Sequence, residues 1–281
     1  MQAQLNLPPL HTFIEYEAIK TNFRFRCSEL NEVKSLTENS LTRLGQRYDE
    51  KMKYDVIDDM IKKYNFEKNF SVEFPDREDW YNNLIDLDED ADYWFTDGSR
   101  TESGTGCGIY CSNTNEQISY GLNKDSTVFL AEVQAINCCA TLNLEQNIRN
   151  RTIYINSDSK SALEALQSSE ITSGKVLETV NSLNSLGKWN KLKIRWIPAH
   201  KGLDGNEKAD SLAKAATKMY GPEPFIGLPW CILKSCMKKW MYDESPKFWE
   251  SQKNLKAKLG QEMIGFPEKI KAKDILKLNR Q

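Results

Sequence analysis

The sequence predicts an α/β fold: a mixed five-stranded sheet flanked by helices, with helical N- and C-terminal extensions. Two observations predict it. From residue 93, three short runs of aromatic and β-branched residues are separated by polar turns, which is the pattern of an antiparallel meander. From residue 127, segments with helical periodicity alternate with short apolar strands. A meander followed by this alternation predicts three antiparallel strands and then parallel ones, with helices covering the sheet.

The meander contains the first three predicted strands. The run "YWFTDGS", residues 93–99, is a strand that a turn stops. The runs "GCGIYCSN", residues 106–113, and "EQISYGLN", residues 116–123, follow it, and a polar Asn-Thr-Asn separates these two. Such short polar connections favour antiparallel neighbours.

The remaining elements alternate between helices and strands. Residues 127–146 place Val133, Ile136, Ala140 and Leu144 on one helical face, so they predict a helix. The elements after it are a strand at 151–159, helices at 160–168 and 176–186, a strand at 191–200 and a helix at 206–218.

Three regions are predicted along the chain. Residues 1–91 form a helical and loop extension, in which "LPPLHTFIEYEAIK" and "YDVIDDMIKKYNF" have helical spacing and an acidic linker follows. Residues 92–219 form the domain that contains the sheet. Residues 220–281 form a basic tail with interleaved aromatic residues.

Composition excludes several classes of protein. The 281 residues are 40% hydrophobic and 28% charged, which is typical of a globular protein, and no apolar run is long enough to span a membrane. The N-terminus lacks the pattern of a signal peptide, so we expect an intracellular protein of the nucleus or cytoplasm that is not secreted. Seven cysteines without finger spacing and only two histidines make a zinc site an unfavoured interpretation.

The net charge of −2 conceals a segregation of charge. The acidic segment 75–94 is interpreted as a solvated face or linker. The lysine-rich C-terminal region allows two interpretations. Lys238, Lys239, Trp240 and Trp249 could follow a nucleic-acid backbone, or the region could be an amphipathic helix that packs against the domain or a neighbour.

Four acids are predicted to meet at one edge of the sheet. Asp97 and Asp158 each stand at the end of a predicted strand, and parallel neighbours bring such positions to the same carboxyl edge, where α/β sheets bind ligands. Glu132 lies near the start of the helix between these strands, and Asp210 lies in the first turns of the last helix. Each acid by itself has an ordinary interpretation as a turn former, a helix cap or a helix-start acid.

Clustered carboxylates repel one another, so a fold that gathers them usually binds a cation. All-oxygen ligands select hard cations such as Mg²⁺, with Mn²⁺ as a substitute. Two such ions are suited to phosphodiester hydrolysis, in which one activates water and the other stabilises the leaving 3′ oxygen. His200, one of only two histidines, precedes Asp210 in a glycine-containing loop and could equally be a surface residue.

Four segments of this sequence resemble the motifs of type 1 ribonuclease H. They are "FTDGS", "AEVQAI", "INSDSKSAL" and "IPAHKGLDGNEKAD", in order and with the expected elements between them. The resemblance covers about Tyr93 to Lys218. It implies a ribonuclease H-like fold, two bound Mg²⁺ ions and an RNA–DNA hybrid as substrate. It also implies a set of catalytic residues, which are the metal-binding carboxylates Asp97, Glu132, Asp158 and Asp210, together with His200.

The resemblance implies two further roles. His200 matches a mobile histidine that assists proton transfer and release of product or metal. Ser99, in the "DGS" segment, is a contact near the scissile strand. A protein recognises RNA at a given position by its 2′-hydroxyl.

Departures from the cellular enzymes narrow the resemblance. The glycine-rich run after the first acid is absent, the stretch between Ser168 and Trp189 has few lysines, and no hybrid-binding module precedes the domain. In these respects the sequence resembles the ribonuclease H domain of insect non-LTR retrotransposon polyproteins, and "LPPLHTFIEYEAIK" is similar to the end of their reverse transcriptase region. A reverse transcriptase region in a longer polyprotein is therefore an expected partner. The alternative function is a retroelement-derived fragment that binds nucleic acid without cutting it.

Overall fold

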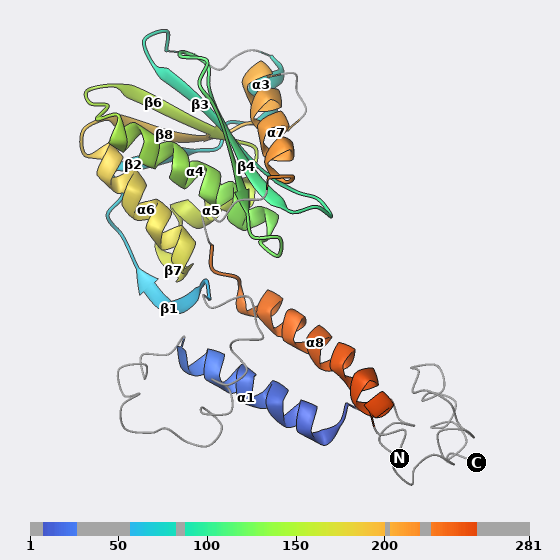
Figure 1. Cartoon of the computed structure of the whole chain (residues 1–281). Coiled ribbons are helices and arrows are strands. Elements are labelled where there is room, and N and C mark those ends of the chain that lie inside the picture. The colour runs from blue at the N-terminus through green and yellow to red at the C-terminus, as the bar shows by residue number, and fades with distance from the viewer. Residues whose placement is uncertain (1–7, 27–56, 83–87, 200–202, 220–225, 252–281) are drawn as a thin grey trace. The chain divides into compact units, whose positions relative to one another are not determined.

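The computed structural model describes residues 8–26, 57–82, 88–199, 203–219 and 226–251. The chain divides into two compact units. One unit runs from Val56 to Pro229 and contains the sheet. The other combines Met1–Asp55 with Trp230–Gln281. The three regions predicted from the sequence remain a proposal, and the sheet-containing unit begins before and ends after the predicted domain (Figure 1).

The centre of the larger unit is a mixed six-stranded sheet with the order β2-β8-β6-β3-β4-β5. Its strands are β2 (Phe70–Glu73), β3 (Asp92–Arg100), β4 (Thr105–Cys111), β5 (Gln117–Leu122), β6 (Thr152–Ser157) and β8 (Lys191–Trp196). The pairs β3–β4 and β4–β5 are antiparallel, whereas β3–β6, β6–β8 and β8–β2 are parallel. The predicted mixed fold is confirmed, and one further strand joins its parallel edge.

That further strand shows where the sequence prediction was wrong. The prediction gave five strands and assigned residues 1–91 to helix and loop, but β2 pairs with β8 from Phe70↔Leu192 to Glu73↔Arg195. The segment predicted as a second short helix contains β1 (Asp59–Tyr64), which pairs with the unpredicted β7 (Glu170–Ser173). These short strands are specified by partners more than 100 residues away, and such tertiary pairing overrides weak local propensity.

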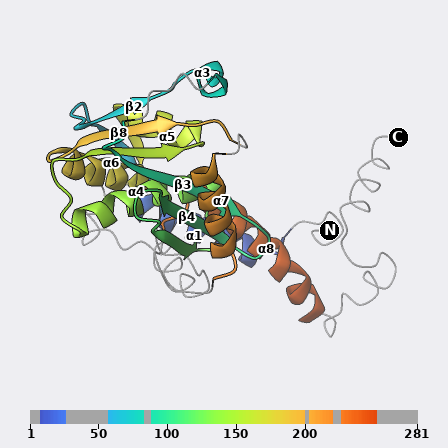
Figure 2. The same cartoon turned by 90° about the horizontal axis from the view of Figure 1, so that it is seen from above.

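The helices of this unit cover both faces of the sheet. They are α3 (Arg77–Tyr81), α4 (Val128–Glu145), α5 (Lys160–Gln167), α6 (Gly174–Gly187) and α7 (Asp204–Ala216). Cys107 of β4 is buried beside α4, while a Cβ at Gly106 or Gly108 would meet α7 at Ala216 or Ala209. Since neighbouring strand residues point to opposite faces, α4 and α7 lie on opposite sides of the sheet. Helices α4 and α6 lie side by side (Figures 1 and 2).

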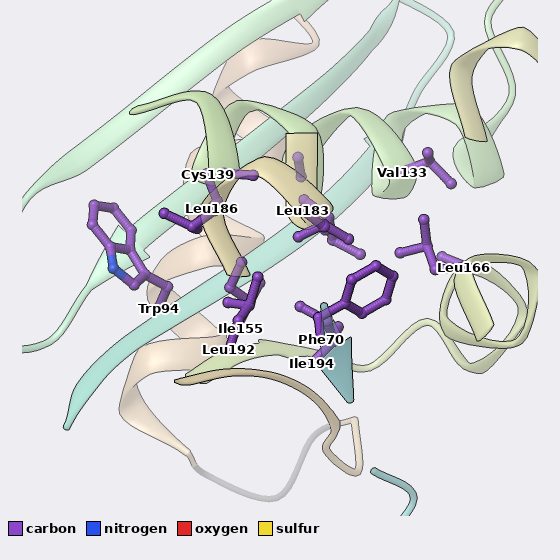
Figure 3. Close-up of a cluster of buried hydrophobic side chains, with 14 of the residues drawn as sticks. Phe70, Trp94, Val133, Cys139, Ile155, Leu166, Leu183, Leu186, Leu192 and Ile194 are labelled. Carbon is purple, nitrogen blue, oxygen red and sulfur yellow. The ribbon is translucent and has the colours of Figure 1, made fainter. Parts of the chain in front are cut away.

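A hydrophobic core lies between the sheet and the layer of α4, α5 and α6. Figure 3 shows Phe70 of β2 and Trp94 of β3 in this cluster with Leu166 of α5 and Leu183 of α6. Leu166 and Leu183 are fully buried. Burial of such a side chain stabilises the fold by roughly 1.5–3 kcal/mol, so this core contributes to the stability of the sheet.

The second unit contains two helices that pack together, α1 (Leu10–Arg26) and α8 (Trp230–Ser251). The buried face of α8 includes Leu233, Met237 and Met241, which recur at intervals of four residues. On α1, Ala18 and Ile19 are buried. The described residues thus contain one helix in each predicted extension, although the N-terminal one also contains β1 and β2.

The residues predicted to form a basic aromatic surface all lie on α8. Lys238 and Lys239 are exposed, Trp240 is half-buried, and the side chain of Trp249 lies outside the described part. Among the described helices, none combines the length and hydrophobicity required to cross a membrane.

Candidate metal centre

Two of the predicted acids stand at the carboxyl edge of neighbouring parallel strands. The parallel pairing of β3 with β6 ends at Thr96↔Ser157, so Asp97 and Asp158 are each the next residue of their chain. This placement agrees with the sequence prediction. However, β3 does not end in a turn at Asp97, because its antiparallel pairing with β4 continues as far as Arg100.

A close approach between α4 and β3 brings the third acid to this edge. A Cβ placed on Gly98 would lie 2.5 Å from the backbone nitrogen of Glu132, so only glycine permits this contact without a shift. The helix is capped by Thr127, whose side chain accepts a hydrogen bond from the Leu130 amide. Glu132 follows one turn later and is 5% exposed.

The three carboxylates form a compact group. One carboxylate oxygen from each of Asp97, Glu132 and Asp158 lies within 4.8 Å of the others. Asp97 is 7% exposed, and Oε2 of Glu132 is buried without a hydrogen-bond partner among the described residues. Among the residues that the structure describes, no lysine or arginine forms an ion pair with any of these three carboxylates. Buried, unneutralised carboxylate oxygens fit a hard divalent cation.

Burial and mutual repulsion raise the pKa values of two of these acids. Burial, followed by the charges of Asp158 and Asp210, raises the pKa of Asp97 to about 7. The pKa of Glu132 lies well above its ordinary value because of burial and the charges of Asp97 and Asp158. Hydrogen bonding by the Gly98 amide opposes both increases. A bound cation would offset this repulsion, and its binding would compete with protonation of these carboxylates.

Asp210 occupies the margin of this group. It lies on α7, close enough to Asp97 for its charge to raise the pKa of that acid. Its Oδ2 accepts a hydrogen bond of 2.6 Å from Nζ of Lys214 one turn later. Three of the predicted acids thus lie close together, and the fourth, Asp210, lies beside them and is paired with the ammonium of Lys214.

The two other predicted site residues are Ser99 and His200. Ser99 lies on β3, two residues beyond Asp97, and is half-buried. His200 lies outside the described residues, in the connection between β8 and α7. The roles of both residues remain proposals.

Sequence reasoning missed two side chains that contact Asp158. Nδ2 of Asn206 donates a hydrogen bond of 3.2 Å to Oδ2 of Asp158, and Asn206 is 6% exposed. The indole Nε1 of Trp196 donates to the backbone oxygen of Asp158 at 3.2 Å. Asn206 precedes Asp210 by four residues, so helical spacing already placed it on the same face of α7.

One stretch of this chain matches the model of a known protein family. The stretch begins just before β3 and ends just after α7, and it includes all three clustered carboxylates and Asp210. The six-stranded mixed sheet with its flanking helices is consistent with the fold of that family. Residues 89–218, somewhat under half of the chain, match the family model described as RNase H.

Proposed function

We propose that this protein is a metal-dependent endonuclease that hydrolyses the RNA strand of RNA–DNA hybrids. The observation that carries the proposal is the group formed by Asp97, Glu132 and Asp158, which come from β3, α4 and the end of β6. This group lies inside the region similar to RNase H. A cluster of carboxylates that is not neutralised by a lysine or arginine is suited to phosphodiester hydrolysis assisted by divalent cations.

The donor set selects the cation. Asp97, Glu132, Asp158 and Asp210 would hold two Mg²⁺ ions, for which Mn²⁺ is a possible substitute, because carboxylate oxygens prefer hard ions. When bound, such ions supply positive charge that activates water and neutralises the leaving oxygen. The chain itself orients the ligands, since Asn206 holds one oxygen of Asp158 and the core fixes the strand ends.

The remaining proposed roles concern the substrate. Ser99 contacts the scissile RNA strand, and His200 assists proton transfer and product release. Recognition of RNA rests on the 2′-hydroxyl, which DNA lacks. We also propose a retrotransposon origin, a reverse transcriptase region as a partner in a longer polyprotein, and an intracellular location in the nucleus or cytoplasm. Reading the coding sequence upstream of this chain for a continuous polymerase frame tests that origin.

One assay tests the nuclease activity. Purified protein is incubated with a labelled RNA–DNA hybrid and Mg²⁺, and a parallel reaction replaces Mg²⁺ with EDTA. We expect RNA cleavage that requires the metal, and no cleavage of duplex DNA of the same sequence. Hybrid binding without cleavage under any divalent cation would instead favour the alternative function, a nucleic-acid-binding fragment of a retroelement.

A further inference from the structure

A second feature lies at the same edge of the sheet as the carboxylates. It is a pocket of about 230 Å³ lined by Phe74, Pro75, Asp76, Arg77, Lys160 and Trp196. These residues come from the segment after β2, the start of α5 and the end of β8. Residues 74–77 lie upstream of the stretch that matches RNase H, so the pocket combines that region with additional chain.

Two contacts connect the pocket to the carboxylate group. Trp196 pairs in the sheet with Ser157, which precedes Asp158, and its indole nitrogen donates to the Asp158 backbone oxygen at 3.2 Å. Lys160 follows Asp158 by two residues and begins α5. Asp158 of the carboxylate group and Lys160 of the pocket therefore belong to the same short connection between β6 and α5.

The lining combines cations with flat apolar groups. Among the described residues, Arg77 is exposed and forms no ion pair. The ammonium of Lys160 lies 3.9 Å from Glu164 in an exposed pair, and solvent screens such a pair so that it holds the ammonium only weakly. Trp196 and Phe74 are half-buried and present aromatic surface. Asp76 is the acid of this lining and opposes an anionic ligand. Cations beside aromatic rings are the usual combination for binding a nucleotide strand.

The sheet sets the distance between the pocket and the carboxylates. Strands β8 and β2 are the second and third neighbours of β3 on its parallel side. With a strand spacing of about 4.8 Å, the pocket lies roughly 10–15 Å along the edge from Asp97. At about 3.4 Å of rise per nucleotide, this distance corresponds to roughly three to four base pairs.

We propose that this pocket is a nucleotide-binding subsite for the nucleic-acid strand that reaches the carboxylate group. A backbone phosphate lies between Arg77 and Lys160, and the adjoining nucleotide packs against Trp196 and Phe74. The subsite rests on the proposed nuclease function. It would contribute to substrate binding a few nucleotides from the scissile phosphate.

The test measures binding separately from cleavage. Fluorescence anisotropy with a labelled hybrid, in EDTA and at several KCl concentrations, compares the full-length protein with the double variant Arg77→Gln, Lys160→Gln. We expect roughly 10- to 100-fold weaker binding from the loss of charged hydrogen bonds. The salt slope should fall by about one unit, because one phosphate is no longer neutralised. In Mg²⁺, the KM of the variant should rise while its kcat stays near that of the wild type.

Two matched variants control for charge. Lys188→Gln, Lys191→Gln removes the same charge at the opposite end of β8, where both lysines are exposed, and should leave the salt slope unchanged. Asp76→Asn should tighten binding. If the Arg77, Lys160 variant binds like the Lys188, Lys191 variant, the subsite is overturned. If the wild type binds hybrid but never cuts it, the nuclease function fails, while the binding comparison still decides the subsite.

Discussion

Asp97 shows how its surroundings change the chemistry of one residue. In the sequence it belongs to an Asp-Gly pair, which is most often a turn. In the fold it lies inside β3, buried beside two other carboxylates, and its pKa is raised to about 7. A side chain that would be ionised in water at neutral pH is therefore partly protonated in the fold.

The first prediction concerns the two acids at the strand ends. Asp97→Asn and Asp158→Asn should each reduce hybrid cleavage to background while the protein remains folded, because an amide is a poorer ligand than a carboxylate for Mg²⁺. Cleavage rates at one fixed Mg²⁺ concentration, with circular dichroism as the folding control, test this. Wild-type rates in either variant would refute the assignment of the site.

The second prediction concerns pH and stability without metal. The ordinary pKa of an aspartate is 3.8, whereas folded Asp97 holds its proton up to about pH 7. Between these values the folded state binds more protons than the unfolded state, so the free energy of unfolding falls as pH rises. In EDTA, Asp97→Asn should therefore raise the Tm at pH 8 by several degrees, since each kcal/mol changes Tm by roughly 2–4 °C.

The same comparison at pH 5 is the control for this second prediction. There the wild-type carboxyl is already protonated, so the gain in Tm should largely disappear. Mg²⁺ should also raise the Tm of the wild type at pH 8 and have little effect on the variant. An equal gain in Tm at both pH values would mean that repulsion at Asp97 is not the cause.

The third prediction concerns His200. His200→Ala should slow turnover by roughly 10²-fold at most, because a residue that assists proton transfer or product release contributes to rate. Binding of hybrid and of Mg²⁺ should stay nearly unchanged. Single-turnover and steady-state rates, compared with binding isotherms, separate these effects. Complete inactivity, or a large loss of Mg²⁺ affinity, would instead identify a structural or ligand role.

At the scale of elements, the position of Glu132 depends on how closely α4 packs on β3. Gly98 lies beneath the backbone of Ala131 and Glu132, where an added Cβ would meet three atoms within 2.9 Å. The periodicity of residues 127–146 predicted the helix, but its distance from the sheet depends on one glycine in another element. Helix register and helix placement are therefore encoded in different parts of the chain.

The fourth prediction tests this packing. Gly98→Ala should destabilise the fold by about 1–3 kcal/mol through overpacking, and should lower Mg²⁺ affinity by displacing Glu132. Chemical denaturation and metal titration measure the two effects. Gly174→Ala is the matched control, because its Cβ would lie 3.4 Å from the nearest atom, an ordinary contact. Equal effects of the two substitutions would show that close packing at Gly98 does not position Glu132.

At the scale of the whole molecule, the excess of basic residues near the C-terminus and the clustered carboxylates belong to different compact units. The carboxylates lie within Val56–Pro229. Residues 230–281 carry twelve Lys and Arg against six Asp and Glu, although the whole chain is slightly acidic. The sheet-containing unit ends after residue 219, because Ile226 and Leu228 are buried and the side chain of Asn123 bonds to the Ile226 backbone.

The fifth prediction follows from this division. A chain ending at Pro229 should stay folded and cut hybrid, but it should bind hybrid more weakly and with a shallower dependence on salt. The reason is that it lacks the lysines of the C-terminal region, including Lys238 and Lys239, and each lost phosphate contact lowers the salt slope by about 0.9. Anisotropy at several KCl concentrations measures this. An unchanged slope, or an unfolded product, would assign the region a structural role.

The sequence by itself predicted the main architecture and the three acids that the structure brings together, Asp97, Glu132 and Asp158. The meander strands, the alternating helices and strands, and their order along the chain follow from hydrophobic periodicities that are strong over whole segments. Asp97 and Asp158 could be placed at one edge because neighbouring parallel strands necessarily share it. These inferences depend only on local pattern and on general rules of topology.

Only the tertiary structure decided the features that depend on distant partners. Strands β1, β2 and β7 have four to six residues each, and their pairing with remote segments outweighs their weak local preference. The burial that raises the pKa of Glu132, and the pocket that joins Arg77 to Lys160, exist only once separate segments pack together. Periodicity determines which face a residue occupies, whereas desolvation and charge proximity depend on what covers that face.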